Sequence, residues 1–139
     1  MPSTFDKAGV ITDPDMRDLY RWDGHHGDAC EVCHRPWAKA GWLGLAVHHL
    51  IHGANGRSDE WCNLLLLCGR CHDLSHDGQY RDEETKELLP SLTLGNLLWV
   101  KSYTPDWDEK RLTALYHRTL PEWERLPQFY LDERKRWKR

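Results

Sequence analysis

The stretch CGRCHDLSH, residues 68–76, places two cysteines and two histidines within nine positions. Thiolate sulfur and imidazole nitrogen are both good zinc ligands, so the four side chains could hold one ion together or divide between two. The first alternative describes a domain held together by a single metal. The second describes a domain with another metal beside the structural one.

A second Cys-x2-Cys pair bears on this choice. Cys30 and Cys33 have the same spacing as Cys68 and Cys71. The spacing lets two sulfur atoms reach one ion from a tight turn, and two such pairs supply the four tetrahedral ligands of a structural zinc site. A redox dithiol or chance buried thiols would not require a matching pair. We therefore expect all four cysteines to bind one structural Zn²⁺, which leaves both histidines of the stretch for another role.

The two histidines have the spacing of one helix face. A helix is predicted over residues 71–79, and His72 and His76 stand at i and i+4 on it, so their side chains lie together. Adjacent helical positions point about 100° apart, so Cys71 and His72 cannot easily face the same ion. The histidines therefore form a second metal half-site, which needs at least one further ligand.

His48 and His49 are the candidates for that ligand. The apolar run LGLAVHHLI, residues 43–51, has a β-branched centre and predicts a strand across about 45–50. Neighbouring residues on a strand point to opposite sides, so only one of the two histidines should join the half-site. The other can stand beside the metal and take a proton from water, because imidazole titrates near neutral pH.

The elements around these residues follow in a short order. We expect a knuckle at 30–33, the strand across 45–50, a polar loop over 52–60, a second buried strand over 63–67, a second knuckle at 68–71 and the helix over 71–79.

The segment HHLIHGANGRSDEWCNLLLLCGRCHDLSH, residues 48–76, resembles the HNH endonuclease motif of the ββα-metal nucleases. It has a His pair on the first strand, Asn63 at the start of the second and a histidine on the following helix. The flanking cysteine pairs resemble the zinc-stapled branch of the family, and the His-rich site is most similar to that of the colicin DNases. The resemblance covers residues 30 to about 78 and implies an α+β fold with a treble-clef-like ββα-metal core.

The resemblance also implies a role for each site residue. His49 would be the general base that activates the attacking water. Asn63 would orient His49 by hydrogen bonding across the two strands. His48, His72 and His76 would hold one divalent metal, which would stabilise the scissile phosphate and the leaving 3′ oxygen. The implied reaction is hydrolysis of DNA phosphodiester bonds that leaves a 5′ phosphate.

One departure from the family concerns the metal. Many HNH proteins have Asp where this chain has His48. An imidazole ligand makes the site softer, so Zn²⁺, Mn²⁺ and Ni²⁺ become candidates beside Mg²⁺. Arg57 and Arg70 are candidates for contact with the DNA backbone, although solvated arginines are equally common.

Composition and charge argue against a disordered, secreted or membrane protein. The 139-residue chain is 40% hydrophobic and has eight tryptophans, which favours a folded domain. No signal peptide is visible, and the longest aliphatic run is Leu64–Leu67, too short to cross a bilayer, so we expect a cytoplasmic protein that does not enter a membrane. The net charge is −3, but residues 132–139 hold five basic residues against two acids, a tail that could touch phosphate or keep the terminus soluble.

The sequence outside the core motif predicts several helices. We expect a short helix near 16–22 and, beyond Tyr80, helical segments over 81–90, 92–102 and 106–120, the last with Asp106 as its N-cap and Glu109 at capping-box spacing. The predicted division is an HNH nuclease domain over 1–100, with its core motif at 30–78, and a helical C-terminal extension with a basic tail over 101–139.

The alternative to an endonuclease is a non-catalytic treble-clef zinc module that binds nucleic acid or protein. Such a module has no need of His48, His49, Asn63, His72 and His76 in nuclease order, which favours the enzyme. Small free-standing HNH proteins resemble phage and mobile-element nucleases, including those encoded beside DNA-packaging machinery. Because a single such domain typically cuts one strand, double-strand cleavage would need a homodimer or a partner such as a phage packaging terminase.

Overall fold

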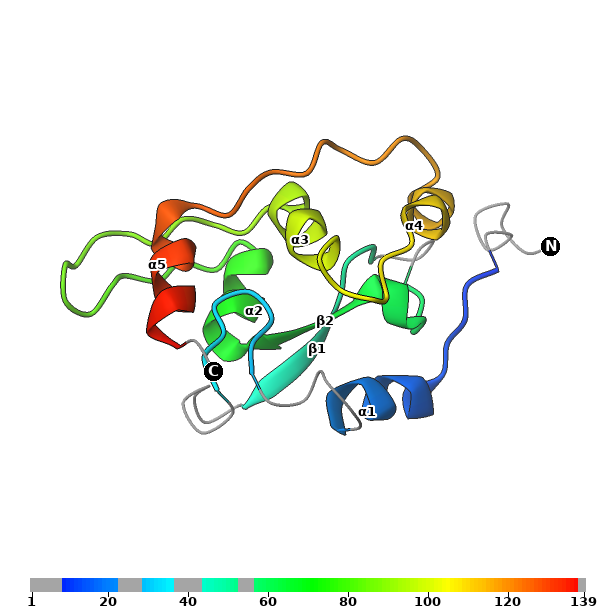
Figure 1. The fold of residues 1–139 in the computed structure, drawn as a ribbon, viewed down its shortest axis with the longest axis horizontal. Coiled ribbons are helices and arrows are strands. Elements are labelled where there is room, and N and C mark those ends of the chain that lie inside the picture. The colour runs from blue at the N-terminus through cyan, green and yellow to red at the C-terminus, as the bar shows by residue number, and fades with distance from the viewer. Residues whose placement is uncertain (1–8, 23–28, 37–43, 53–56, 138–139) are drawn as a thin grey trace.

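A two-stranded antiparallel hairpin lies at the centre of the fold, with helices on both sides (Figure 1). The computed structural model describes residues 9–22, 29–36, 44–52 and 57–137. The elements in chain order are α1 (Pro14–Trp22), β1 (Leu45–His49), the 3-10 turn η3 (Trp61–Asn63), β2 (Leu64–Cys68), α2 (Gly69–Ser75), α3 (Leu94–Lys101), α4 (Glu109–Tyr116) and α5 (Gln128–Arg136). The hairpin followed by α2 confirms the predicted α+β fold with a ββα core.

The hairpin pairs Leu45 with Cys68 at one end and His49 with Leu64 at the other. The first strand agrees with the predicted span. The second begins one residue later than predicted, because Asn63 ends η3 and its N–H donates to the carbonyl of Glu60 at 2.9 Å. All residues of β2 are buried, so its sequence shows no polar alternation.

Helix α2 is shorter than predicted and shifted toward the N-terminus. Cys68 is its N-cap residue, so the second knuckle and the helix overlap. The helix ends before 79 because Asp77 has a φ of 64° and the N–H of Gly78 donates to the carbonyl of Asp73 at 2.7 Å. A Cβ at position 78 would lie 2.8 Å from that same oxygen, which explains the glycine.

The predicted helix over 81–90 is wrong. Residues Arg81 and Leu88 form an isolated antiparallel bridge instead. The Asp82 carboxylate accepts hydrogen bonds from the N–H groups of Glu84 and Thr85, and Lys86 has a φ of 62°. This Asx-type turn satisfies the backbone locally and so competes with the helix.

The later helices lie where they were predicted, but the N-cap residue of one of them differs. Helices α3 and α4 lie within the predicted spans, and α5 lies in the extension that was expected to be helical. The N-cap of α4 is Asp108, whose side chain accepts from the N–H of Arg111, and not Asp106. Asp106 lies 3.7 Å from the buried ammonium group of Lys101, an ion pair that the chain sequence alone does not reveal.

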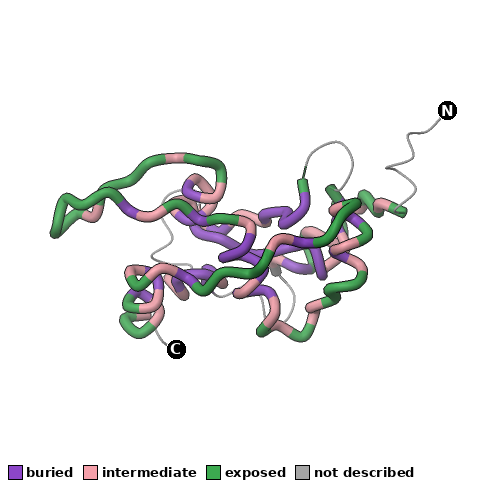
Figure 2. The backbone as a smooth tube through the Cα atoms, turned by 90° about the horizontal axis from the view of Figure 1, so that it is seen from above, coloured by how far each residue is buried: buried purple, intermediate pink, exposed green. Residues whose placement is uncertain are grey.

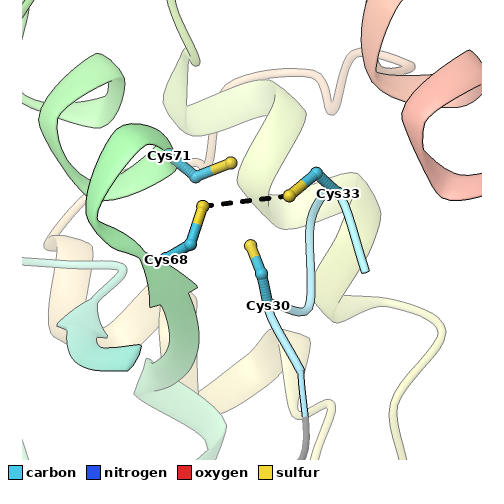
Figure 3. A group of neighbouring side chains, drawn as sticks. All are labelled: Cys30, Cys33, Cys68 and Cys71. Atoms are coloured by element: carbon cyan, nitrogen blue, oxygen red, sulfur yellow. Dashed lines mark hydrogen bonds between the residues drawn. The ribbon is translucent and has the colours of Figure 1, made fainter. Parts of the chain in front are cut away.

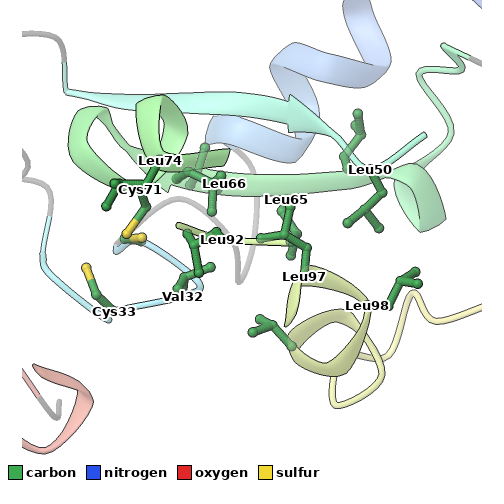
Figure 4. Packing of buried hydrophobic residues seen from close by; sticks show 14 of the residues in the cluster. Val32, Cys33, Leu50, Leu65, Leu66, Cys71, Leu74, Leu92, Leu97 and Leu98 are labelled. Atoms are coloured by element: carbon green, nitrogen blue, oxygen red, sulfur yellow. The ribbon is translucent and has the colours of Figure 1, made fainter. Parts of the chain in front are cut away.

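The hydrophobic core lies between the hairpin and the helices that follow it (Figure 2). Val32 of the first knuckle, Leu66 of β2 and Leu97 of α3 are part of this core (Figure 4). Leu112 of α4 and Tyr130 of α5 belong to the same buried cluster. The predicted boundary near residue 100 stays a prediction, and the core contains side chains from both sides of it. None of the described helices is long and apolar enough to cross a membrane.

Candidate active site and metal centres

The four paired cysteines converge on one buried point (Figure 3). Their Sγ atoms all lie within 4.8 Å of one another, and the Sγ atoms of Cys33 and Cys68 are 3.8 Å apart. Zn–S bonds of about 2.3 Å in a tetrahedron place sulfur atoms about 3.8 Å apart, whereas a disulfide needs about 2 Å. The geometry fits a structural zinc ion, as the spacing predicted.

The electrostatics of the cluster also suit a cation. Hydrogen bonds from Cys30, Cys33 and Cys71 lower the pKa of the Cys68 thiol. The hydrogen bond from Cys30 likewise lowers the pKa of Cys33 to about 7, while burial raises that of Cys30 well above its ordinary value. Zinc binds the thiolate form, so binding of one zinc ion would release the protons that the four thiols share.

Hydrogen bonds from neighbouring elements hold the first knuckle, residues 30–33, in place. The N–H of Glu31 donates to the carbonyl of Leu66 on β2, and the Glu31 carboxylate accepts from the N–H of Leu66. From α5, the Arg134 guanidinium donates to the carbonyl of Val32 at 2.8 Å. The cysteine cluster is thus tied to the hairpin and to the C-terminal helix.

A second group of ligands lies where β1 meets α2. One donor atom from each of His48, His72 and His76 can be chosen so that all three lie within 4.8 Å of one another. The ring centroids are 4.8 to 5.4 Å apart, and the rings stand steeply to one another. His48 is buried and His76 is exposed, so the group has a closed side and a side open to solvent. The three histidines are brought together as predicted.

His48 and His72 are held in the neutral form that binds metal. Burial, with the neighbouring His72 and His76, lowers the pKa of His48 to about 3. Burial and His76 also lower the pKa of His72. Neutral imidazole offers its lone pair, so this set of donors fits a divalent cation. His52 lies beside the group, with its ring centroid 5.7 Å from that of His76.

His49 has different partners from its neighbour His48, although both line the same cavity. It does not belong to the ligand group, and its Nε2 lies 2.7 Å from Oδ1 of Asp59. Burial lowers the pKa of His49, and the hydrogen bond to Asp59 opposes that shift. The side chain of Asp59 is itself almost fully buried and 3.3 Å from Nε of Arg17.

Asn63 acts on the loop between the strands. Its Oδ1 accepts from the N–H of Ile51 at 2.8 Å, and its Nδ2 donates to the carbonyls of Ile51 and Ser58. The Asn63 side chain thus bonds across the two strands at Ile51, and its role in orienting His49 stays a prediction. Asn63 closes the loop that carries Asp59, and Asp59 contacts His49.

One cavity of about 580 Å³ contains both histidine sets. Arg17 and Arg21 of α1 line it from one side, and Arg57 lines it as well. Arg70 is not brought to this cavity: it lies over the ring of Phe129 and lines another hollow, beside Glu133.

Sequence reasoning missed the contribution of α1 and Asp59. Arg17 and Arg21 share a helix face by their i, i+4 spacing, which was a usable signal. Nothing in the sequence marks Asp59, because its contacts to His49 and Arg17 depend on the folded loop.

Comparison with known proteins agrees with these positions. Residues 30–78 match the family model described as HNH endonuclease. The match spans both cysteine pairs and the histidines of the cavity. No curated protein and no solved structure matched the chain.

Proposed function

Because residues 30–78 match an HNH endonuclease domain, we propose that this protein is a metal-dependent endonuclease that hydrolyses phosphodiester bonds in DNA. One observation carries the proposal. A three-histidine metal half-site, a separate histidine and three arginines meet in a single open cavity. A purely structural zinc module would need none of them.

His48, His72 and His76 would hold the divalent metal. When bound, the metal would polarise the scissile phosphate and neutralise charge on the leaving 3′ oxygen. Three neutral imidazoles are borderline-soft ligands, so Zn²⁺, Ni²⁺ and Mn²⁺ are candidates together with Mg²⁺.

His49 would take the proton from the attacking water. Its ring lies at the cavity wall but outside the metal ligand group, so its second nitrogen is not committed to the metal. A general base of this kind contributes roughly 10²- to 10⁴-fold to rate. Attack on phosphorus with departure of the 3′ oxygen leaves a 5′ phosphate.

The arginines of the cavity would bind phosphate. Arg21 of α1 and Arg57 both line it, and guanidinium groups bind phosphate oxygens in bidentate geometry. These contacts would position the DNA backbone without reading its sequence. One cavity serves one strand, so the isolated chain should nick, and double-strand cleavage would need a second copy or a partner.

Cleavage of supercoiled plasmid tests this function. The zinc-loaded protein is incubated with DNA and Mg²⁺, Mn²⁺, Ni²⁺ or added Zn²⁺, and the nicked product is followed on a gel. We expect nicking with 5′-phosphate ends, and a loss of about 10²-fold or more in His49→Ala. His117→Asn is the matched control, since His117 lies at the C-cap of α4 with a φ of 65° that Asn tolerates.

Two results would reject the proposal. One is wild-type protein that cleaves with none of these metals, which would favour the non-catalytic zinc module. The other is His49→Ala that cleaves at the wild-type rate, which would remove the assignment of the base.

A further inference from the structure

Asp59 forms a buried link between the candidate base and helix α1. Its side chain is 4% exposed. Oδ1 lies 2.7 Å from Nε2 of His49 and 3.3 Å from Nε of Arg17, and Oδ2 accepts a hydrogen bond of 2.7 Å from the N–H of Asp13. Both carboxylate oxygens are therefore engaged, and three separate segments meet at this one side chain.

The chemistry of these contacts determines the tautomer of His49. A carboxylate can only accept hydrogen bonds, so the hydrogen of the neutral imidazole must sit on Nε2. The lone pair then sits on Nδ1, which has no hydrogen bond within the part of the chain that the structure describes. Nδ1 is the nitrogen that can accept a proton from water.

We propose that Asp59 is the positioning residue of the general base, holding His49 in the Nε2–H tautomer with Nδ1 directed to water. The inference rests on the proposed nuclease function and adds a residue to it. Arg17 supports the arrangement, because its guanidinium lies against the same Oδ1 and helps keep the carboxylate in place. Asp59 touches neither DNA nor metal in this role and acts through His49.

A simpler role for Asp59 would be to anchor α1. Its bond from the N–H of Asp13 lies just before the first turn of that helix, so removing the carboxylate could detach α1. The two roles differ in what they do to the His49 ring. An anchor leaves the tautomer of His49 undetermined, whereas a positioning residue fixes it.

Asp59→Asn separates the two roles because it keeps the size of the side chain. With the single amide oxygen accepting from Asp13, the amide NH2 faces Nε2 of His49 and also loses the ion pair with Arg17. That nitrogen must become an acceptor, so the hydrogen moves to Nδ1 and the base is blocked. We expect kcat for plasmid nicking to fall by about 10²- to 10⁴-fold, with KM changed less than about threefold and zinc content unchanged.

Asp15→Asn is the matched control. Asp15 lies on the first turn of α1, is exposed and does not line the cavity, so the variant removes a similar charge without touching His49. We expect it to nick at the wild-type rate. Asp59→Asn that also nicks at the wild-type rate would overturn the proposal.

A second measurement needs neither a variant nor cleavage. Long-range ¹⁵N–¹H NMR spectra of histidine-labelled wild-type protein distinguish the two tautomers of His49. The Nε2–H form is expected, and the Nδ1–H form would overturn the proposal even if DNA is cleaved. Failure of the wild-type protein to cleave DNA would instead count against the nuclease function. The NMR spectra would still report the tautomer of His49.

Discussion

His48 and His49 are adjacent in the chain but have different surroundings. His48 faces two histidines of α2, and His49 faces Asp59. Their partners differ, although both side chains line the same cavity. One short dipeptide can therefore supply both a metal ligand and a candidate base to the same cavity.

His72→Ala should weaken the second metal without disturbing the first. His72 is one of the three grouped ligands but contributes nothing to the cysteine cluster. Loss of a direct ligand should reduce the affinity by more than the roughly 10- to 100-fold that loss of an outer-shell partner costs. Isothermal titration with Mn²⁺ measures this, with zinc content as the internal control. Unchanged Mn²⁺ affinity in the variant would show that the three histidines do not share one ion.

Helix α1 connects regions that are distant in sequence. Its Arg17 meets Asp59, and the carbonyl of Met16 accepts a hydrogen bond from the indole of Trp61. These contacts place the arginine face of α1 over the cavity. The helix precedes the matched family segment and yet forms part of the cavity wall.

Arg21→Ala should weaken DNA binding uniformly across sequences. If Arg21 contacts a phosphate, its loss should reduce the slope of log affinity against log salt by about 1. Fluorescence anisotropy with two unrelated duplexes at several salt concentrations measures the slope. Arg118→Ala is the matched control, because Arg118 is exposed, stacks on Tyr116 and lies outside the cavity. Equal slopes for Arg21→Ala and the wild-type protein would remove α1 from the DNA interface.

The sequence predicted the hairpin, α1 and α3 from local patterns, and the spacing within 30–78 predicted that four cysteines and three histidines gather in two groups. It failed over 81–90, where the charged run suits a helix but Asp82 caps a turn instead. It also missed Asp59. That residue acts through a loop closed by Asn63, and no periodicity reports such a contact.

The whole molecule depends on the cysteine cluster, since its members belong to the same buried core as β2, α3 and α5. The core of a 139-residue chain is modest, and the cluster joins its first knuckle to the hairpin. The same cluster positions the start of α2, which presents His72 and His76. Stability and the candidate catalytic geometry would therefore both depend on this one candidate zinc site.

Cys30→Ser should abolish zinc binding and the cooperative fold together. Structural zinc contributes about 10–16 kcal/mol in small domains, which is comparable with a whole domain's stability of about 5–15 kcal/mol. Thermal unfolding followed by tryptophan fluorescence should lose its cooperative transition. Cys62→Ser is the control, because Cys62 is buried but lies outside the cluster, and it should keep its zinc. A Cys30→Ser protein that unfolds like the wild type would contradict a structural role for the cluster.

The metal content of the purified protein tests the central claim most directly, namely that residues 68–76 serve two different metal sites. Elemental analysis after dialysis against Zn²⁺ or Mn²⁺, followed by a brief chelator wash, counts each class of ion. We expect one zinc that resists the wash and one further ion that the wash removes, with the second absent from His72→Ala. A single ion per chain in both proteins would contradict the claim.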